Sequence, residues 1–148
     1  MLSDITPSMA YLPMSREQFL ASVNRASTLK ADEKHYPNVY EIPGGKVEHD
    51  DPTIQAAITR EVLEESSLLV KDVSRPLSII TYTTESGAGT RNVIQLSYVI
   101  TVQDTQFQVN PEEHSTGIWA NIDMLAQLEI TRDMKTLVSE ALVQEAKF

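Results

Sequence analysis

Three glutamates in one short segment have the type and the spacing to do chemistry. Glu61, Glu64 and Glu65 are related by steps of three and four residues, so their carboxylates would share one face of a helix. Like charges at this spacing repel one another unless something compensates them. Hard divalent cations take oxygen ligands, and Mg²⁺ needs only a few carboxylates besides waters and substrate phosphates. The pattern therefore predicts a divalent-metal site, with Arg60 as a partial counter-charge because it can reach Glu64 one turn away.

A helix must position these glutamates, and the sequence predicts one over residues 52–66. Asp51 is expected to cap its start, and the proline that follows is tolerated there because that N–H would have no partner within the helix. Ile54, Ala57 and Ile58 lie on the same line as the glutamates. The acidic face is therefore expected to look toward the protein body, where crowded carboxylates require a counter-charge.

The other elements predict a mixed β-sheet with about three helices, in an α+β fold or an α/β/α sandwich arrangement. Apolar and β-branched runs mark the strands, and proline or glycine clusters mark the breaks between them. The loop over residues 87–89 contains two glycines, which suits a hairpin tip or a mobile flap. The expected strands are 8–14, 18–24, 39–42, 77–84, 92–102 and 117–122, with a turn at 15–17, a loop at 25–37, and helices at 123–128 and 132–147.

Size and composition predict one folded domain over residues 1–148. The chain has 148 residues, of which 41% are hydrophobic and 22% charged, enough for one packed core. It has no long apolar run, and no basic stretch followed by an apolar block near its start, so we expect neither a membrane span nor a secretory signal. The absence of cysteine excludes disulfides and thiolate chemistry and suits a reducing compartment, so a cytoplasmic location is expected.

The chain is acidic, with 21 acidic and 12 basic side chains and a formal net charge of −9. Such a surface repels the nucleic-acid backbone, so binding to duplex nucleic acid is not expected. A phosphate ligand would need local basic residues or a bound cation to reverse the field at its site. The acidity therefore also points toward a metal.

A glycine turn and the acidic helix occur together in one run of the sequence. Gly45 is followed by Asp51 and then by Arg60-Glu61-Val62-Leu63-Glu64-Glu65-Ser66-Ser67-Leu68. This run resembles the signature of the Nudix hydrolase family, which reads glycine, five residues, glutamate, seven residues, Arg-Glu, apolar, any, Glu-Glu, any, glycine, apolar. The resemblance implies the Nudix fold and an enzyme that cleaves the diphosphate linkage of a nucleoside diphosphate joined to another moiety.

The run departs from that signature at three points. Asp51 stands where glutamate is usual, eight residues instead of seven separate it from Arg60, and Ser67 replaces the last glycine. A residue other than glycine at a left-handed helix end costs about 1 kcal/mol, which the fold should tolerate. The resemblance covers essentially the whole chain. Residues 9–25 resemble the paired strands before the signature, Tyr40-Glu41-Ile42-Pro43 resembles its lead-in, and Glu113-His114 and Trp119 resemble the later loop and strand.

The resemblance implies roles for the residues of this run. Glu61, Glu64 and Glu65 would bind the metal, and a backbone carbonyl at Gly45 would complete the shell because glycine lets the backbone approach a ligand closely. Mg²⁺ is the implied cofactor, with Mn²⁺ as a possible substitute, and it would activate the water that attacks phosphorus. Arg60 would orient one of the carboxylates.

The general base and the phosphate contacts lie partly outside the run. The base stays open among the three glutamates and two carboxylates of a later loop, Glu112 and Glu113. Lys46 and Arg91 are candidate phosphate contacts, and each is equally well interpreted as a solvated charge on the surface. Arg91 borders the glycine loop, which could close over a ligand.

Aromatic and histidine side chains carry weaker signals. Trp119 and Tyr82 could stack on a nucleobase, although a tryptophan like this is more often part of the core. His114, beside glutamates, is interpreted as a loop residue that forms hydrogen bonds rather than as a ligand. His35 and His49 are expected at the surface.

Two other functions compete with the hydrolase. The same fold could bind a nucleotide or an RNA 5′ end without hydrolysing it, although the glutamates of the metal site are all present. It could also be a protein-interaction scaffold, which would leave the glycine turn and the inward acidic face unexplained. The expected partner is a small nucleotide-type substrate, and a homodimer is possible. Which substrate is accepted depends on loops whose positions the sequence does not predict.

Overall fold

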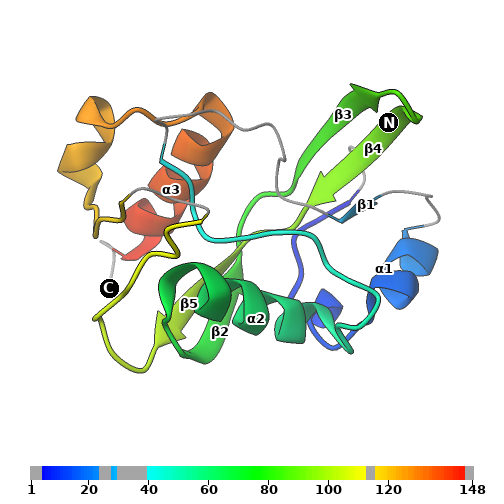
Figure 1. Ribbon diagram of the computed structural model, residues 1–148, viewed down its shortest axis with the longest axis horizontal. Helices are drawn as coiled ribbons and strands as arrows, with labels where there is room; N and C mark the ends of the chain where they lie inside the picture. The colour runs from blue at the N-terminus through cyan, green and yellow to red at the C-terminus, as the bar shows by residue number, and fades with distance from the viewer. Residues whose placement is uncertain (1–4, 24–27, 30–39, 113–115, 146–148) are drawn as a thin grey trace.

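The structure is a computed structural model that describes residues 5–23, 28–29, 40–112 and 116–145 (Figure 1). No helix within these ranges is long and apolar enough to cross a membrane. The helices are α1 (Arg16–Ser22), α2 (Ile54–Ser66) and α3 (Arg132–Glu145), with 3₁₀ helices at Met9–Tyr11 and Ile122–Gln127. The strands are β1 (Thr28–Leu29), β2 (Val70–Pro76), β3 (Ile80–Ser86), β4 (Gly89–Gln95) and β5 (Tyr98–Val102).

The strands form two small sheets, and one continuous segment of the chain runs through both. Strand β4 pairs with β3 as an antiparallel hairpin and with β1 in parallel, which gives the order β1-β4-β3. Strand β2 pairs antiparallel with β5. Only Leu96 and Ser97 separate β4 from β5, so the chain passes directly from one sheet to the other. The predicted mixture of parallel and antiparallel pairing is confirmed.

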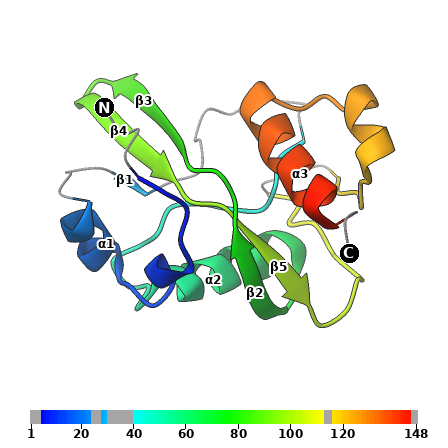
Figure 2. The ribbon, with the colours of Figure 1, turned by 180° about the vertical axis from the view of Figure 1, so that it is seen from behind.

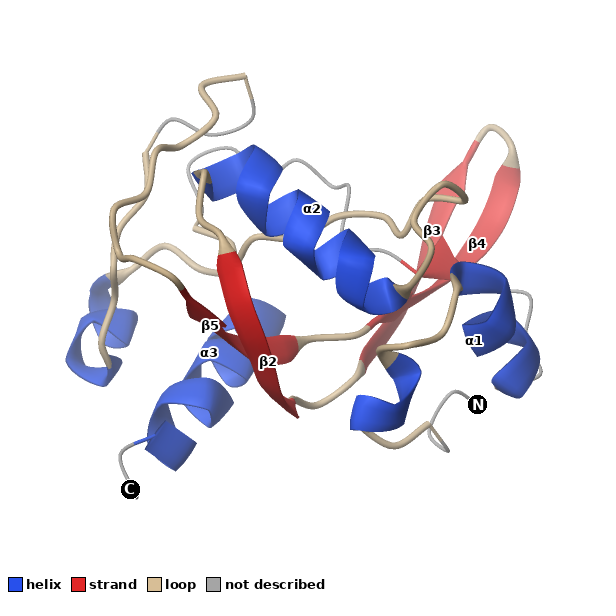
Figure 3. Cartoon of the chain, turned by 90° about the horizontal axis from the view of Figure 1, so that it is seen from below, coloured by secondary structure: helices blue, strands red, loops and turns tan. Residues whose placement is uncertain are grey.

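Helices α2 and α3 cover opposite faces of the β2–β5 sheet (Figure 3). In Figure 1 α2 lies in front of these strands, and in Figure 2, from behind, the strands lie in front of α2. Side chains alternate along β5, so Ile100 packs in the core on the α2 side while Val99 packs beside Leu137 of α3. The predicted α+β fold with an α/β/α arrangement is confirmed.

The N-terminal segment is helical, and the two strands predicted over 8–14 and 18–24 are wrong. Ser15 caps α1: its Oγ accepts from the Gln18 backbone N–H at 3.1 Å, and Gln18 Oε1 accepts from the Ser15 N–H at 2.8 Å. This reciprocal pair satisfies two donors that a helix start leaves without partners. Phe19 is then buried on the inner face of α1. The predicted turn at 15–17 is therefore the start of a helix.

The strand predictions are partly wrong in register and extent. Strand β2 was not predicted, because only Val73 among its residues is buried and the rest of the strand is largely polar or exposed. The predicted strand 77–84 is β3, which begins at Ile80, and the predicted strand 92–102 is β4 and β5 with a break between them. The predicted hairpin tip is confirmed, since Ser86 pairs with Gly89 across the turn.

Three further segments differ from their predicted form. Residues 117–121 are not a strand. Gly117 lies so close to the side chains of Phe107 and Val109 that a Cβ there would overlap both. In the predicted strand 39–42, Tyr40 alone among the described residues pairs, in a bridge with Ile130. The predicted loop 25–37 contains β1, and the rest of it lies outside the described residues. The two C-terminal helices were predicted, the first of them 3₁₀ in form.

Helix α2 begins later than predicted and ends in a left-handed residue. Thr53, not Asp51, is its N-cap, and Thr53 Oγ1 accepts from the Ala56 N–H at 3.0 Å. The carboxylate of Asp51 is instead turned toward Arg60. At the other end, Ser67 has φ 60° and ψ 15°, the left-handed conformation that glycine adopts most easily.

Replacing Ser67 with glycine is expected to leave stability unchanged or to raise it by up to about 1 kcal/mol. Glycine carries no Cβ penalty at positive φ, although it also increases the freedom of the unfolded chain. Urea denaturation measures the change. The matched control is Ser139→Gly inside α3, which is expected to cost roughly 0.5 kcal/mol. A clear loss of stability in Ser67→Gly would show that the hydroxyl contributes more than the conformational relief.

Candidate active site

The glycine turn lies against the acidic face of α2. The Gly44 N–H donates to Glu65 Oε2 at 2.9 Å, and a Cβ built on Gly45 would overlap the carboxylate of Glu61. Two side chains one turn apart on the helix are thus brought to two successive residues of the turn. Glu61 is only 15% exposed while Glu64 is 53% exposed, so the acidic face runs from the protein body outward to solvent.

Glycine at position 45 is required by this close approach. The Glu61 carboxylate occupies the space that any β-carbon at position 45 would need. No unusual backbone angle explains the residue, since Gly89 is the described glycine with positive φ. The absence of a side chain, rather than conformational freedom, is what Gly45 supplies.

Arg60 connects the turn to the helix through several hydrogen bonds. Its Nε and one terminal nitrogen bind the two oxygens of Asp51, both at 2.8 Å, in a bidentate pair. Its other terminal nitrogen donates to Glu61 at 2.7 Å and to Glu64 at 3.3 Å. A further bond of 3.0 Å reaches the carbonyl of Lys46. Hydrogen bonding to Asp51, and then to Glu61, raises the pKa of Arg60 above its ordinary value, so this side chain is a fixed positive charge.

Asp51 is the buried partner of this clamp. Its side chain is 7% exposed, and it accepts from the Glu48 N–H at 2.7 Å as well as from Arg60. The hydrogen bonds from Arg60 hold the pKa of the Asp51 carboxyl below its ordinary value; burial opposes this and the Glu48 N–H assists it. The ion pair between Asp51 and Arg60 thus holds the loop before α2 against the helix. The one extra residue relative to the signature lies between these two residues.

Replacing Asp51 with asparagine is expected to flatten the acid dependence of stability. A carboxyl whose pKa is lower in the folded chain stabilises it above the unfolded pKa of about 3.9. That contribution is lost as pH falls through the lower folded pKa. The difference in Tm between wild type and Asp51→Asn should therefore be largest near neutral pH and shrink below about pH 4. Asp72→Asn on exposed β2 is the control, and a difference for Asp51→Asn that stays constant from pH 7 to pH 3 would contradict the assignment.

The segment after β5 closes the C-terminal end of α2. Gln108 N–H donates to the Ser66 carbonyl at 2.9 Å, and Asn110 N–H donates to the Glu65 carbonyl at 3.1 Å. These bonds satisfy carbonyls that a helix end leaves without partners. They bring Asn110 to the end of the acidic face. Glu112 follows two residues later, and its N–H donates to the Asn110 side chain at 3.0 Å. Glu113 and His114 lie outside the described residues.

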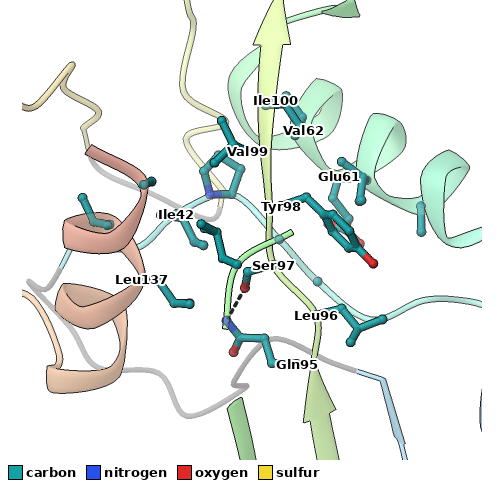
Figure 4. A pocket seen from close by; sticks show the side chains of 18 of the residues that line it. Ile42, Glu61, Val62, Gln95, Leu96, Ser97, Tyr98, Val99, Ile100 and Leu137 are labelled. Carbon is teal, nitrogen blue, oxygen red and sulfur yellow. Dashed lines mark hydrogen bonds between the residues drawn. The ribbon is translucent and has the colours of Figure 1, made fainter. Parts of the chain in front are cut away.

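A cavity of about 380 Å³ adjoins the turn and Glu61, and Figure 4 shows the side chains of most of its lining residues. Its wall is mostly apolar and comes from both cores, including Ile58 of α2 and Leu137 of α3. Trp119 also lines it, and at 56% exposed it is not the core residue that its type suggests. The cavity thus combines an apolar wall with the carboxylate of Glu61. Sites for small molecules have this form.

The donor chemistry of the acidic face fits a hard divalent cation. Carboxylate oxygens from one helix face lie beside backbone of the glycine turn, and such ligands suit Mg²⁺. Among the described residues, however, no three acidic or histidine side chains are gathered closely enough to form a ready-made metal cluster. Arg60 binds Glu61 and Glu64, so these carboxylates would have to turn partly away from it to share a cation.

The remaining predicted contacts are only partly brought together. Lys46 follows the glycine turn directly, and its half-buried side chain starts beside the clamp. Arg91 is exposed on β4, opposite Thr84, on the hairpin that extends away from α2 in Figures 1 and 3. Tyr82 lies on the same hairpin. His49 is exposed as expected and pairs with Glu17 at 2.6 Å, while His35 lies outside the described residues.

Two features of the site were not predicted. The sequence placed Asp51 at the helix cap, so its bidentate bond to Arg60 was missed, although an acid near an arginine of the same run was a signal for it. Gln95 and Ser97, both buried and both in the cavity wall, have no recognisable motif. Their position becomes visible only when the chain is folded.

Comparisons with known proteins agree with this geometry. A family model described as the NUDIX domain matches residues 9–141. The solution structure of the E. coli ORF135 protein is similar, with a TM-score of 0.55 and 20% sequence identity over 83% of this chain and 85% of that one. At this identity the similarity concerns the fold. No curated protein sequence matches the chain significantly.

Proposed function

We propose that this chain, which belongs to the NUDIX domain family, is a metal-dependent hydrolase of a nucleoside diphosphate joined to another moiety. The family as a class hydrolyses diphosphate linkages, which are acid anhydrides. We further propose that the substrate is a nucleotide, that the reaction requires a divalent metal, and that the residues named below take part in it.

One observation supports the site most strongly. Glu61 and Glu65 reach the two glycines of one turn from a single helix face, and Arg60 ties that helix to the loop through Asp51. A solvated acidic helix would need neither a glycine without room for a Cβ nor a buried ion pair. Both features serve a site that holds carboxylates at fixed positions around a cation.

The residues of the chain have distinct proposed roles. Glu61, Glu64, Glu65 and the backbone at Gly45 would hold Mg²⁺, or Mn²⁺ in its place. A cation there supplies neutralisation of charge on the phosphoryl oxygens and a water of lowered pKa. Arg60 orients Glu61 and, held by its bidentate pair with Asp51, is assigned no contact with substrate.

The base and the phosphate contacts complete the proposal. One carboxylate of the acidic face, or Glu112 from the segment at the end of α2, takes the proton of the attacking water. Lys46 binds a phosphate beside the turn. In a chain with a formal net charge of −9, a local cation and a lysine are also what would let a polyanionic substrate approach the site.

A panel of nucleoside diphosphate derivatives tests the function. Hydrolysis of such a substrate gives a nucleoside monophosphate and the phosphorylated second moiety, so release of the nucleoside monophosphate would be measured by chromatography with Mg²⁺, Mn²⁺ or EDTA. We expect turnover of at least one member with either metal and none with EDTA. Binding of nucleotides without turnover of any member, by folded protein with metal bound, would favour the non-hydrolytic binding module instead.

A further inference from the structure

The cavity beside Glu61 contains a polar pair in a wall that is mostly apolar (Figure 4). Gln95 and Ser97 are each only 6% exposed, and Gln95 Nε2 donates to Ser97 Oγ at 3.3 Å. The two side chains lie together because residues two apart in an extended chain point to the same side. Their neighbours in the wall are apolar: Ile42, Leu77, Val99 and Leu137.

The carboxamide of Gln95 lies in an unfavourable environment, because most of the surrounding wall is apolar. Burying an amide among apolar groups costs free energy when its donors and acceptor are not bonded. A glutamine has two N–H donors and one carbonyl acceptor, and the bond to Ser97 uses one donor. That bond directs the amide nitrogen toward Ser97. The other N–H and the carbonyl together match a ligand edge that presents an acceptor and a donor side by side.

Trp119 is an aromatic residue of the same cavity wall. Its indole N–H donates to the Thr105 carbonyl at 2.9 Å, and its ring packs edge-on against Phe107 at a centroid distance of 5.8 Å. The ring is therefore held in place although more than half of the residue is exposed. Nucleobases bind to such rings by stacking.

We propose that Gln95, oriented by Ser97, determines which nucleobase this cavity accepts, with the base stacked on Trp119. The inference rests on the proposed function, because the same cavity reaches Glu61 and the glycine turn. A nucleotide can then place its base in the cavity and its phosphates at the acidic face. The cavity volume of about 380 Å³ lies within the range of small-ligand sites, roughly 300–1,000 Å³.

Fluorescence of the single tryptophan tests this directly. Trp119 is the one tryptophan of the chain, so its emission reports on the cavity without hydrolysis. The protein would be titrated in EDTA with the monophosphates of adenosine, guanosine, cytidine and uridine, and with ribose 5-phosphate. We expect one nucleotide to bind at least about tenfold more tightly than ribose 5-phosphate, with clear differences among the bases. Equal Kd values for all five ligands, or no binding by any, would overturn the proposal.

A variant assigns the discrimination to Gln95. Gln95→Met keeps the length of the side chain and removes its hydrogen bonds, so the spread of Kd among the four bases should fall to within about threefold. Gln103→Met, an exposed site on the segment after β5, is the matched control and should keep the full spread. An unchanged spread in folded Gln95→Met would contradict the assignment. If that variant does not fold by circular dichroism, Ser97→Ala should reduce the spread because it releases the amide, and an unchanged spread would count against the proposal equally.

The experiment separates this inference from the function on which it rests. Base-selective binding in EDTA without hydrolysis in metal would leave the specificity site standing and remove the hydrolase. Hydrolysis in metal that is equally fast for all four bases and for a substrate without a base would leave the hydrolase and remove the specificity site.

Discussion

Glu65→Gln is expected to lower kcat by at least about 100-fold while leaving the fold intact. The glutamine oxygen can still accept the hydrogen bond that the Gly44 N–H gives to Glu65 at 2.9 Å, so the turn should stay in place. What is lost is the negative charge, and a neutral amide is a poor ligand for Mg²⁺. Losing one preorganised polar group at a reacting centre typically costs on the order of 10²–10³ in rate. Steady-state kinetics with Mg²⁺ at saturating substrate measures the effect.

The control for this substitution is the same change elsewhere. Glu85→Gln lies exposed on β3, in the hairpin away from α2, and should leave kcat unchanged. Thermal melts of both variants show whether the fold is kept. Near wild-type kcat in folded Glu65→Gln would mean that this carboxylate is not part of the site, and the assignment of the acidic face would fail with it.

Gly45→Ala is expected to lower kcat/KM by about 100-fold or more with a modest change in Tm. The added Cβ overlaps the carboxylate of Glu61, which is the end of a flexible side chain and can move aside. The fold should therefore survive, but Glu61 would leave its position beside the turn and beside Arg60. A displacement of about 1 Å in a catalytic group can cost 100-fold in rate.

Gly87→Ala is the matched control because it adds the same methyl group where no atom lies within 4 Å. It should change neither kcat/KM nor Tm appreciably. If Gly45→Ala kept full activity, the close approach of Glu61 to the turn would have no functional meaning. If it failed to fold, Glu61→Gln would test the same contact from the helix side, and full activity in that variant would contradict the proposed role.

The acidic helix could be predicted because its information is local. Steps of three and four residues place glutamates on one face of any helix, and Ile54 and Ala57, on the same line, are buried as expected. The reach from Arg60 to Glu64 also follows from helix geometry and is observed at 3.3 Å. Even the left-handed Ser67 could be anticipated, because the signature marks that position with glycine.

The errors arise where tertiary contacts outweigh local preference. Apolar residues around Ser15 were interpreted as strands, although Ser15 and Gln18 form a capping box that the sequence already contained. Strand β2 was missed because an exposed strand keeps few apolar residues, and its pairing with β5 rather than its composition holds it in place. Asp51 was placed as a cap because it stands directly before the predicted helix, whereas its contact with Arg60 depends on how the loop before α2 folds.

The cavity could not be predicted at all from sequence. Its wall combines residues from the glycine turn, α2, the β4–β5 junction and α3, which lie far apart in the chain. Gln95 is an ordinary polar residue at the end of a strand until α3 covers it. Function that depends on such a wall, including substrate choice, becomes accessible only through the packing of the elements.

The most direct test of the central claim is the metal dependence of turnover, measured for the wild type and for Glu64→Gln on the best substrate of the panel. Both proteins would be assayed at equal folded concentration across a Mg²⁺ titration after treatment with EDTA. The account predicts that EDTA abolishes wild-type turnover, that Mg²⁺ restores it, and that Glu64→Gln stays lower by orders of magnitude at every Mg²⁺ concentration. Turnover that persists in EDTA, or a variant that matches the wild type, would contradict it.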